Sequence, residues 1–177
     1  PEKVEIRSNF LKPLADGELR VRALWGALSR GTESLVYRGE IPESEYQRMA
    51  APWMGGTFPF PVKYGYCHVG RVEGGPADWI GQLVFALRPH ETMYVSDVHV
   101  VVPLPIALSP ERAVLSANME TALNAVWDAS PGPGDKIVIV GGGVVGLSTG
   151  IALLEANPRL KVIIVEKEKT IAMHASG

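Results

Sequence analysis

Two apolar segments in the last third of the chain predict buried parallel strands. Residues 137–140 are a β-branched run that leads directly into glycines, and residues 162–165 are a second run that ends at Glu166. A helical pattern of apolar positions lies between them. The pattern predicts a strand, a tight turn, a helix and a second strand, which is the order of a dinucleotide-binding βαβ unit.

The first hundred residues follow a different pattern, in which apolar and polar residues alternate over short distances. Residues 18–24 alternate most clearly and predict a strand after the Asp16-Gly17 turn. Glycine and proline separate further strand candidates, so we expect an all-β region, a partly open barrel. These candidates are residues 4–7, 62–72 (interrupted at Gly65), 83–87, 93–95 and 98–102.

A helix and a hinge connect the two regions. Ser109 suits an N-cap, Pro110 the first helical position, and apolar residues keep near-helical spacing to Ala129. Residues 130–134, Ser-Pro-Gly-Pro-Gly, then mark a boundary. We therefore expect a first domain over residues 1–130, with a linking helix at 109–129. Residues 135–177 would be the start of a nucleotide-binding domain, incomplete because a doubly wound sheet needs about six strands.

The glycines after the first apolar run carry the clearest chemical signal. Gly141, Gly143 and Gly146 fit the pattern G-x-G-x-x-G. In that pattern the first glycine allows a sharp turn, the second lets the backbone approach a pyrophosphate, and the third lets the helix pack closely on the strand.

The groups around these glycines complete the expected nucleotide site. The free N–H groups of the helix N-terminus, at Val144 and Val145, would face the phosphates. Glu166 follows the last glycine by about 20 residues and would accept hydrogen bonds from a ribose. Two alternatives are a glycine-rich turn in an ordinary α/β core and a membrane-spanning segment at residues 137–154, against which the three consecutive glycines argue.

The composition is typical of a globular protein and argues against some classes of partner. Of the 177 residues, 46% are hydrophobic and 20% charged, which is usual for a globular protein, and the formal net charge of −2 gives no reason to expect nucleic acid or an anionic membrane as partner. A single cysteine, Cys67, excludes an internal disulfide and favours a reducing, cytoplasmic setting. We expect no signal peptide and a small-molecule substrate.

Four segments give residues 1 to about 140 a resemblance to the medium-chain dehydrogenase/reductase (MDR) superfamily. That superfamily has a GroES-like β-barrel before a Rossmann domain. The resemblance implies NAD(P)-linked hydride transfer between an alcohol and a carbonyl compound. The segments are residues 21–24, 29–40 (containing Ser-Arg-Gly-Thr-Glu), 65–72 (Gly-Tyr-Cys-His-Val-Gly-Arg-Val) and 117–126 before Gly134.

The resemblance also indicates which side chains would act. Zinc-dependent members carry a cysteine where this chain has Arg30, and histidine and glutamate where it has Tyr66 and Cys67. Arginine does not ligate Zn²⁺, so we expect no catalytic zinc and a hydrogen-bond donor or proton relay instead. Thr32 matches the superfamily's relay hydroxyl, and Tyr66 or His68 would assist.

Residues 136–177 resemble a different family, the FAD-dependent oxidoreductases of the D-amino-acid-oxidase type, which include the L-2-hydroxyglutarate oxidases. The triple glycine, the Glu-Lys-Glu segment ending at Glu168 and the segment from His174 to Gly177 carry this match. The two resemblances meet near Gly134, which indicates either a dehydrogenase fragment or a chimeric or generated sequence. An FAD-dependent 2-hydroxy-acid or amino-acid oxidoreductase fragment and a non-catalytic nucleotide-binding module therefore stay open.

Several further residues have mainly structural interpretations. Cys67 is typical of a small buried residue rather than a nucleophile, and His90 of a loop residue. His99 is expected on the solvent face of a strand. Glu166 favours the free 2′-hydroxyl of NAD over NADP, although nearby lysines oppose that preference. The unpaired edge of the short sheet predicts self-association into a homo-oligomer.

Overall fold

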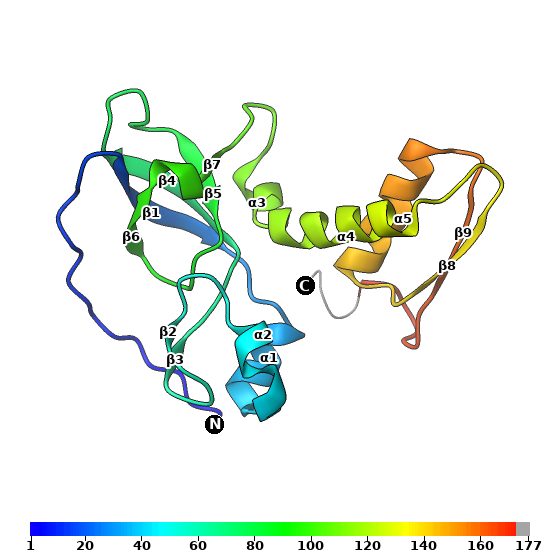
Figure 1. Cartoon of the computed structure of the whole chain (residues 1–177), viewed down its shortest axis with the longest axis horizontal. Coiled ribbons are helices and arrows are strands. Elements are labelled where there is room, and N and C mark those ends of the chain that lie inside the picture. Colours follow the sequence, from blue (N-terminus) through cyan, green and yellow to red (C-terminus); the bar gives the residue numbers. More distant parts are fainter. Residues whose placement is uncertain (173–177) are drawn as a thin grey trace. The chain divides into compact units, whose positions relative to one another are not determined.

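The computed structural model describes residues 1–172, so the predicted segment from His174 to Gly177 lies outside the described residues. Contacts divide the chain into two compact units, residues 1–116 and 117–177, and each is described by itself (Figure 1). The predicted domains, residues 1–130 and 135–177, stay predictions. Among the described residues, no helix combines the length and apolarity needed to span a bilayer.

Unit 1 is built on a five-stranded antiparallel sheet with the order β6-β1-β4-β5-β7. A separate two-stranded ribbon pairs β2 with β3. The strands are β1 (Glu18–Gly26), β2 (Gly55–Gly56), β3 (Val62–Lys63), β4 (His68–Gly74), β5 (Leu83–Ala86), β6 (Met93–Asp97) and β7 (Val102–Pro103).

The alternation seen in the sequence explains how this sheet forms its core. Leu19 and Val21 of β1 point inward and are fully buried, whereas Arg20 and Arg22 between and beyond them are exposed. The pairing of β1 with β4 shifts register twice, and such irregularities increase local twist. The inward residues form one cluster, namely Leu19, Val21, Val72, Val84, Ala86, Tyr94 and Val101.

Helical segments of unit 1 are short. They are α1 (Thr32–Arg38), the 3₁₀ turn η1 (Glu43–Glu45), α2 (Tyr46–Met49), the 3₁₀ turn η2 (Val98–Val100) and α3 (Pro110–Ala113).

Two predicted strands of unit 1 are wrong. Residues 4–7 form no strand, because Val4 and Ile6 find no apolar surface and are exposed. The strand expected at residues 98–102 begins as η2, since the Asp97 carboxylate accepts the His99 N–H at 2.8 Å and closes a turn. His99 is therefore not on a strand.

Unit 2 contains one βαβ unit preceded by a helix. The elements are α4 (Ser116–Ala129), which begins at the unit boundary, β8 (Lys136–Val140), α5 (Val144–Ala156) and β9 (Lys161–Val165). Strands β8 and β9 pair in parallel from Lys136↔Lys161 to Val140↔Val165 (Figure 1). The fold class is thus as predicted, a partly open β-barrel followed by an incomplete Rossmann unit.

The linking helix is not continuous as predicted. It is divided into α3 and α4, and Val114 and Leu115 belong to neither helix. The hydroxyl of Ser116 donates to the Ala113 carbonyl at 2.7 Å. Serine hydroxyls that bond to nearby carbonyls compete with helical hydrogen bonding, which accounts for a break at this point.

Candidate functional site

The turn between β8 and α5 has the backbone geometry that a phosphate-binding turn needs. Gly141 has a φ of +105°, a region that favours glycine, and its N–H donates to the Val165 carbonyl at 2.8 Å. Gly143 is the N-cap of α5. The N–H groups of Val144 and Val145 lie in the first turn, where an α-helix offers them no acceptor of its own.

Gly146 allows α5 to lie against this turn. A Cβ added at Gly146 would lie 2.0 Å from the Gly141 carbonyl oxygen and 3.3 Å from the Cγ2 atom of Ile139. No side chain fits at the first distance, so glycine is required here. The predicted role of the third glycine, close helix packing, therefore matches its surroundings.

Glu166 follows β9 and faces the glycine turn. Its Oε2 atom accepts the N–H of Gly142 at 2.6 Å, and its Oε1 atom accepts the N–H of Glu168 at 3.0 Å. Carboxylate oxygens accept hydrogen bonds from hydroxyl groups as well as from N–H groups. The glycine turn and Glu166, the predicted contacts of the ADP portion that NAD, NADP and FAD share, therefore lie next to each other.

In unit 1, Thr32 begins α1 beside the carboxylate of Glu33. The Thr32 N–H donates to the Ser29 hydroxyl at 3.2 Å. The Glu33 carboxylate accepts the Ser29 N–H and forms a close ion pair with Nε2 of His90. This ion pair raises the pKa of His90 above that of an ordinary histidine, because the adjacent carboxylate stabilises the imidazolium.

Tyr66 lies in the loop before β4 and is half-buried. Its ring meets Tyr64 edge-on, with ring centroids 6.5 Å apart, and the Tyr64 hydroxyl donates to the Met49 carbonyl at 2.7 Å. Burial first, then the neighbouring Tyr66 and Glu33, raise the pKa of Tyr64 to about 12. Tyr64 therefore lies near both Tyr66 and the Glu33–His90 pair.

His68 occupies a different environment, because its side chain points into the core. It is 3% exposed, its ring meets Tyr94 edge-on at 5.0 Å, and Nε2 lies 3.3 Å from the Glu91 carbonyl oxygen. Burial lowers the pKa of His68, so the ring is neutral at neutral pH. The structure thus places Thr32 beside Glu33 and Tyr66 beside Tyr64, and His68 within the core.

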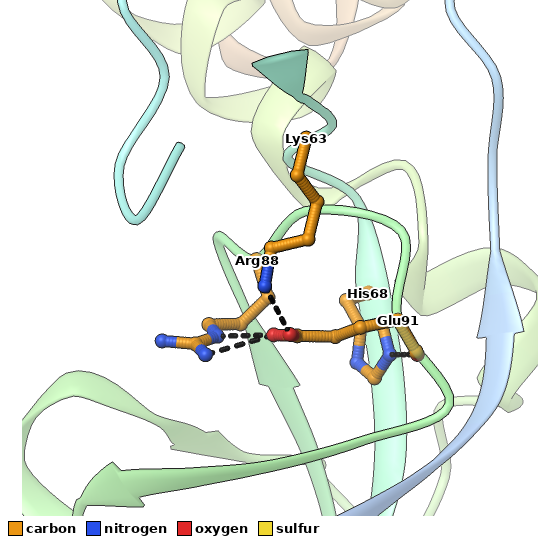
Figure 2. Close-up of polar contacts among 4 residues, drawn as sticks. All are labelled: Lys63, His68, Arg88 and Glu91. Carbon is orange, nitrogen blue, oxygen red and sulfur yellow. Dashed lines mark hydrogen bonds and ion pairs between the residues drawn. The ribbon is translucent and has the colours of Figure 1, made fainter. Parts of the chain in front are cut away.

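A charged cluster lies next to His68 (Figure 2). One oxygen of Glu91 accepts hydrogen bonds from the Arg88 guanidinium at 2.8 and 2.9 Å, and the other accepts from Lys63 Nζ at 2.7 Å. The guanidinium carbon lies 4.6 Å from the ring centroid of Tyr94 and 4.9 Å from that of Trp53. Buried charges are stable only when they are paired, and this cluster meets that condition.

Cys67 is buried, and this burial raises the pKa of its thiol to about 11. The thiolate that a nucleophile requires is therefore scarce at neutral pH. Over residues 1–172, no three His, Cys, Asp or Glu side chains converge where they could hold a metal ion.

Sequence reasoning missed His90, Arg88 and Glu91 as members of a polar cluster. The segment Arg88-Pro-His-Glu91 places three charged or titratable side chains between two apolar strands, which was the available signal. Their partners, Glu33 and Lys63, are distant in sequence, so only the fold reveals the pairs.

Comparison with known proteins confirms both predicted resemblances. The family of FAD dependent oxidoreductases matches residues 136–177. The L-2-hydroxyglutarate dehydrogenase of Dictyostelium discoideum is 60% identical over 41 residues, which are 23% of this chain and 9% of that protein. The human enzyme is 51% identical over 41 residues, again 23% of this chain and 9% of the relative. The chain therefore matches only about a tenth of these relatives.

Solved structures resemble nearly the whole chain in fold. An alcohol dehydrogenase from E. coli CFT073, solved with NADH, has a TM-score of 0.72 and 18% identity, covering 96% of this chain and 55% of its own. The quinone oxidoreductase of Thermus thermophilus has a TM-score of 0.64 and 22% identity, covering 92% and 49%. The chain thus shares the fold of these proteins over about half of their length.

Proposed function

We propose that this chain is the barrel and first nucleotide-binding unit of an oxidoreductase that transfers a hydride between NAD(P) and an alcohol or carbonyl compound, without catalytic zinc. The observation that carries the proposal is the βαβ turn with its acid, placed directly after an MDR-type barrel. The positive φ of Gly141, the close backbone approach at Gly146 and the hydrogen bond of Glu166 to the glycine turn support this proposal.

Different residues would bind the nucleotide and the substrate. The N–H groups of Val144 and Val145 would face the pyrophosphate and Glu166 the adenosine ribose. When bound, NAD(P)H supplies the hydride. In unit 1, Thr32 and Tyr66 supply hydroxyl groups for the substrate oxygen. Arg30, Tyr66 and Cys67 at the positions of the usual metal ligands support a reaction carried by side chains.

The second candidate is an FAD-dependent oxidoreductase acting on a 2-hydroxy acid or an amino acid. The sequence identity of residues 136–177 to L-2-hydroxyglutarate dehydrogenases favours it. The same glycine turn and Glu166 would hold the ADP portion of FAD. The fold of residues 1–116 supports the first candidate instead, because the NAD(P) dehydrogenase structures share it.

A nucleotide titration of the full chain separates these candidates. NADH, NADPH and FAD are added in turn, and binding is read from nicotinamide fluorescence and flavin absorbance. The control is Gly143→Val, because Gly143 has a φ of −76° that valine adopts while its side chain would block the pyrophosphate. Binding of NADH or NADPH that the control loses supports the proposal. Binding of FAD alone moves the function to the second candidate, and no binding contradicts both.

A further inference from the structure

The Glu33–His90 pair joins two segments of unit 1 that are 57 residues apart in sequence. Glu33 lies in the first turn of α1, and its side chain is largely buried, at 12% exposure. His90 follows β5, and its side chain is 39% exposed. The imidazole is thus anchored at Nε2 by a buried carboxylate while part of the ring reaches solvent.

The backbone around His90 fixes the ring further. The His90 N–H donates to the Tyr64 carbonyl at 3.0 Å. A Cβ added at Gly65 would lie 2.9 Å from Cδ2 and 3.0 Å from Nε2 of His90, so the ring occupies space that any other residue would fill. Gly65 also has a φ of +128°, which favours glycine. These contacts hold one ring orientation.

The other ring nitrogen, Nδ1, is not the atom that binds Glu33. Nδ1 lies on the side of Gly26, where an added Cβ would be 3.7 Å away. An imidazole with one nitrogen held by a carboxylate and the other directed elsewhere is the arrangement in which histidine acts as an oriented acid or base.

We propose that His90, oriented by Glu33, is the general acid and base of unit 1, together with the hydroxyl groups of Thr32 and Tyr66, and exchanges its Nδ1 proton with the oxygen of the substrate. This inference rests on the proposed function. In reduction, NAD(P)H would supply a hydride to the carbonyl carbon and become NAD(P)⁺, while the C=O π electrons would move to oxygen. The oxygen then takes the proton of Nδ1, which leaves neutral imidazole with its Nε2–H donating to Glu33.

The charges near His90 suit an acid that works at neutral pH. Glu33 favours the protonated ring, and burial opposes it more weakly. Cys67 and Tyr64 are also near Glu33 and stay neutral, because burial raises the pKa of both. Buried His68 is neutral too. The adjacent Arg88 and Glu91 are paired with each other.

The test compares His90→Gln and Glu33→Gln with the matched control His99→Gln, all in the full chain. The kcat for NAD(P)H-dependent reduction of benzaldehyde and cyclohexanone is measured against pH, beside nucleotide affinity and urea unfolding. We expect His90→Gln to lower kcat about 100-fold or more with nucleotide affinity unchanged. Glu33→Gln should move the alkaline fall in kcat to lower pH, and His99→Gln should resemble the wild type.

A second readout needs neither nucleotide nor substrate. In ¹⁵N NMR, the titration midpoint of His90 should exceed the value of about 6.5 for an unperturbed histidine and should fall in Glu33→Gln. No fall overturns the inference. If His90→Gln binds nucleotide and its kcat is unchanged, the Glu33–His90 pair has only a structural role. That result overturns the inference but not the proposed function. If the wild type binds no NAD(P)H, or binds it and reduces neither carbonyl compound, both the proposed function and the inference fail.

Discussion

Strands of both units alternate between more buried and more exposed residues, but the exposed residues differ in kind between the two units. In β1 of unit 1, inward Leu19 and Val21 are fully buried and their outward neighbours Arg20 and Arg22 are charged. In β8 and β9 of unit 2, burial also alternates, but after Lys136 and Lys161 the outward residues are apolar. Val140 is 86% exposed and Val138 60%, with Ile163 and Val165 on the partner strand also exposed.

The difference shows that unit 2 has the sequence of a sheet covered on both faces. Parallel strands in α/β proteins are usually buried on both sides and apolar throughout. Here α5 covers one face, where a Cβ added at Gly150 would lie 3.3 Å from Ile164 and 3.5 Å from Ile139. We therefore expect unit 1 to be the more stable unit, and we propose that the open face and edge of unit 2 promote self-association.

The largest expected effect is a loss of stability when one carboxylate in each unit is replaced. Glu91→Gln leaves the Arg88 guanidinium buried without its counter-charge, which should destabilise unit 1 by about 3–5 kcal/mol. Glu166→Gln removes the charge of a half-buried carboxylate and replaces one of its two acceptor oxygens with an NH2 donor that faces a backbone N–H, which should cost unit 2 about 1.5–3 kcal/mol. Urea unfolding followed by hydrogen exchange for each unit measures both. Equal losses would contradict the comparison.

Truncation of an apolar strand residue should destabilise unit 1 more than unit 2. Leu19→Ala opens a cavity in the core of unit 1 and should cost about 2–5 kcal/mol. Val140→Ala removes an exposed side chain and should change stability by less than about 0.5 kcal/mol. The same unfolding measurement applies. A large loss in Val140→Ala would mean that another surface covers this face in solution.

Two glycines allow a comparison of close backbone packing. A Cβ at Gly70 of unit 1 would lie 2.5 Å from Val21 Cγ1, and one at Gly146 of unit 2 would lie 2.0 Å from the Gly141 oxygen. Each change to alanine should cost about 1–3 kcal/mol. Only Gly146→Ala should also abolish nucleotide binding. Gly132→Ala, where the nearest atom would be 3.7 Å away, is the control.

The smallest expected effect is a pH dependence of stability that is confined to unit 1. Burial lowers the pKa of His68, so its contribution to stability is present above the unfolded value of about 6.5 and is lost as pH falls through the folded value. His90 acts oppositely, because its raised pKa adds stability at acidic pH that is lost as pH rises. His68→Phe should therefore lessen acid destabilisation of unit 1. The described part of unit 2 contains no histidine and should show no such change in its melting temperature.

The sequence predicts the elements that have a local signal. The alternation of residues 18–24 and the βαβ unit with Gly141, Gly146 and Glu166 all appear in the structure. Local pattern did not reveal that residues 4–7 lack a partner surface, or that the Asp97 side chain starts a turn.

The candidate site of unit 1 was less predictable. The interactions of Glu33 with His90 and of Glu91 with Lys63 join residues that are 57 and 28 positions apart. The sequence states which groups exist, but only strand pairing brings them together. Tyr66 and His68 also differ in their surroundings. Tyr66 follows the turn at Gly65 and lies in a loop, whereas His68 is the first residue of β4.

Hydrogen exchange of the full chain, with and without NADH, tests the central claim most directly. The claim is that unit 2 holds the ADP portion of the nucleotide on its glycine turn. We predict slower exchange at the amides of residues 141–147 and around Glu166 with NADH, and the same slowing with ADP alone. Gly143→Val should show neither. Unchanged exchange in this turn at saturating NADH and ADP would contradict the account.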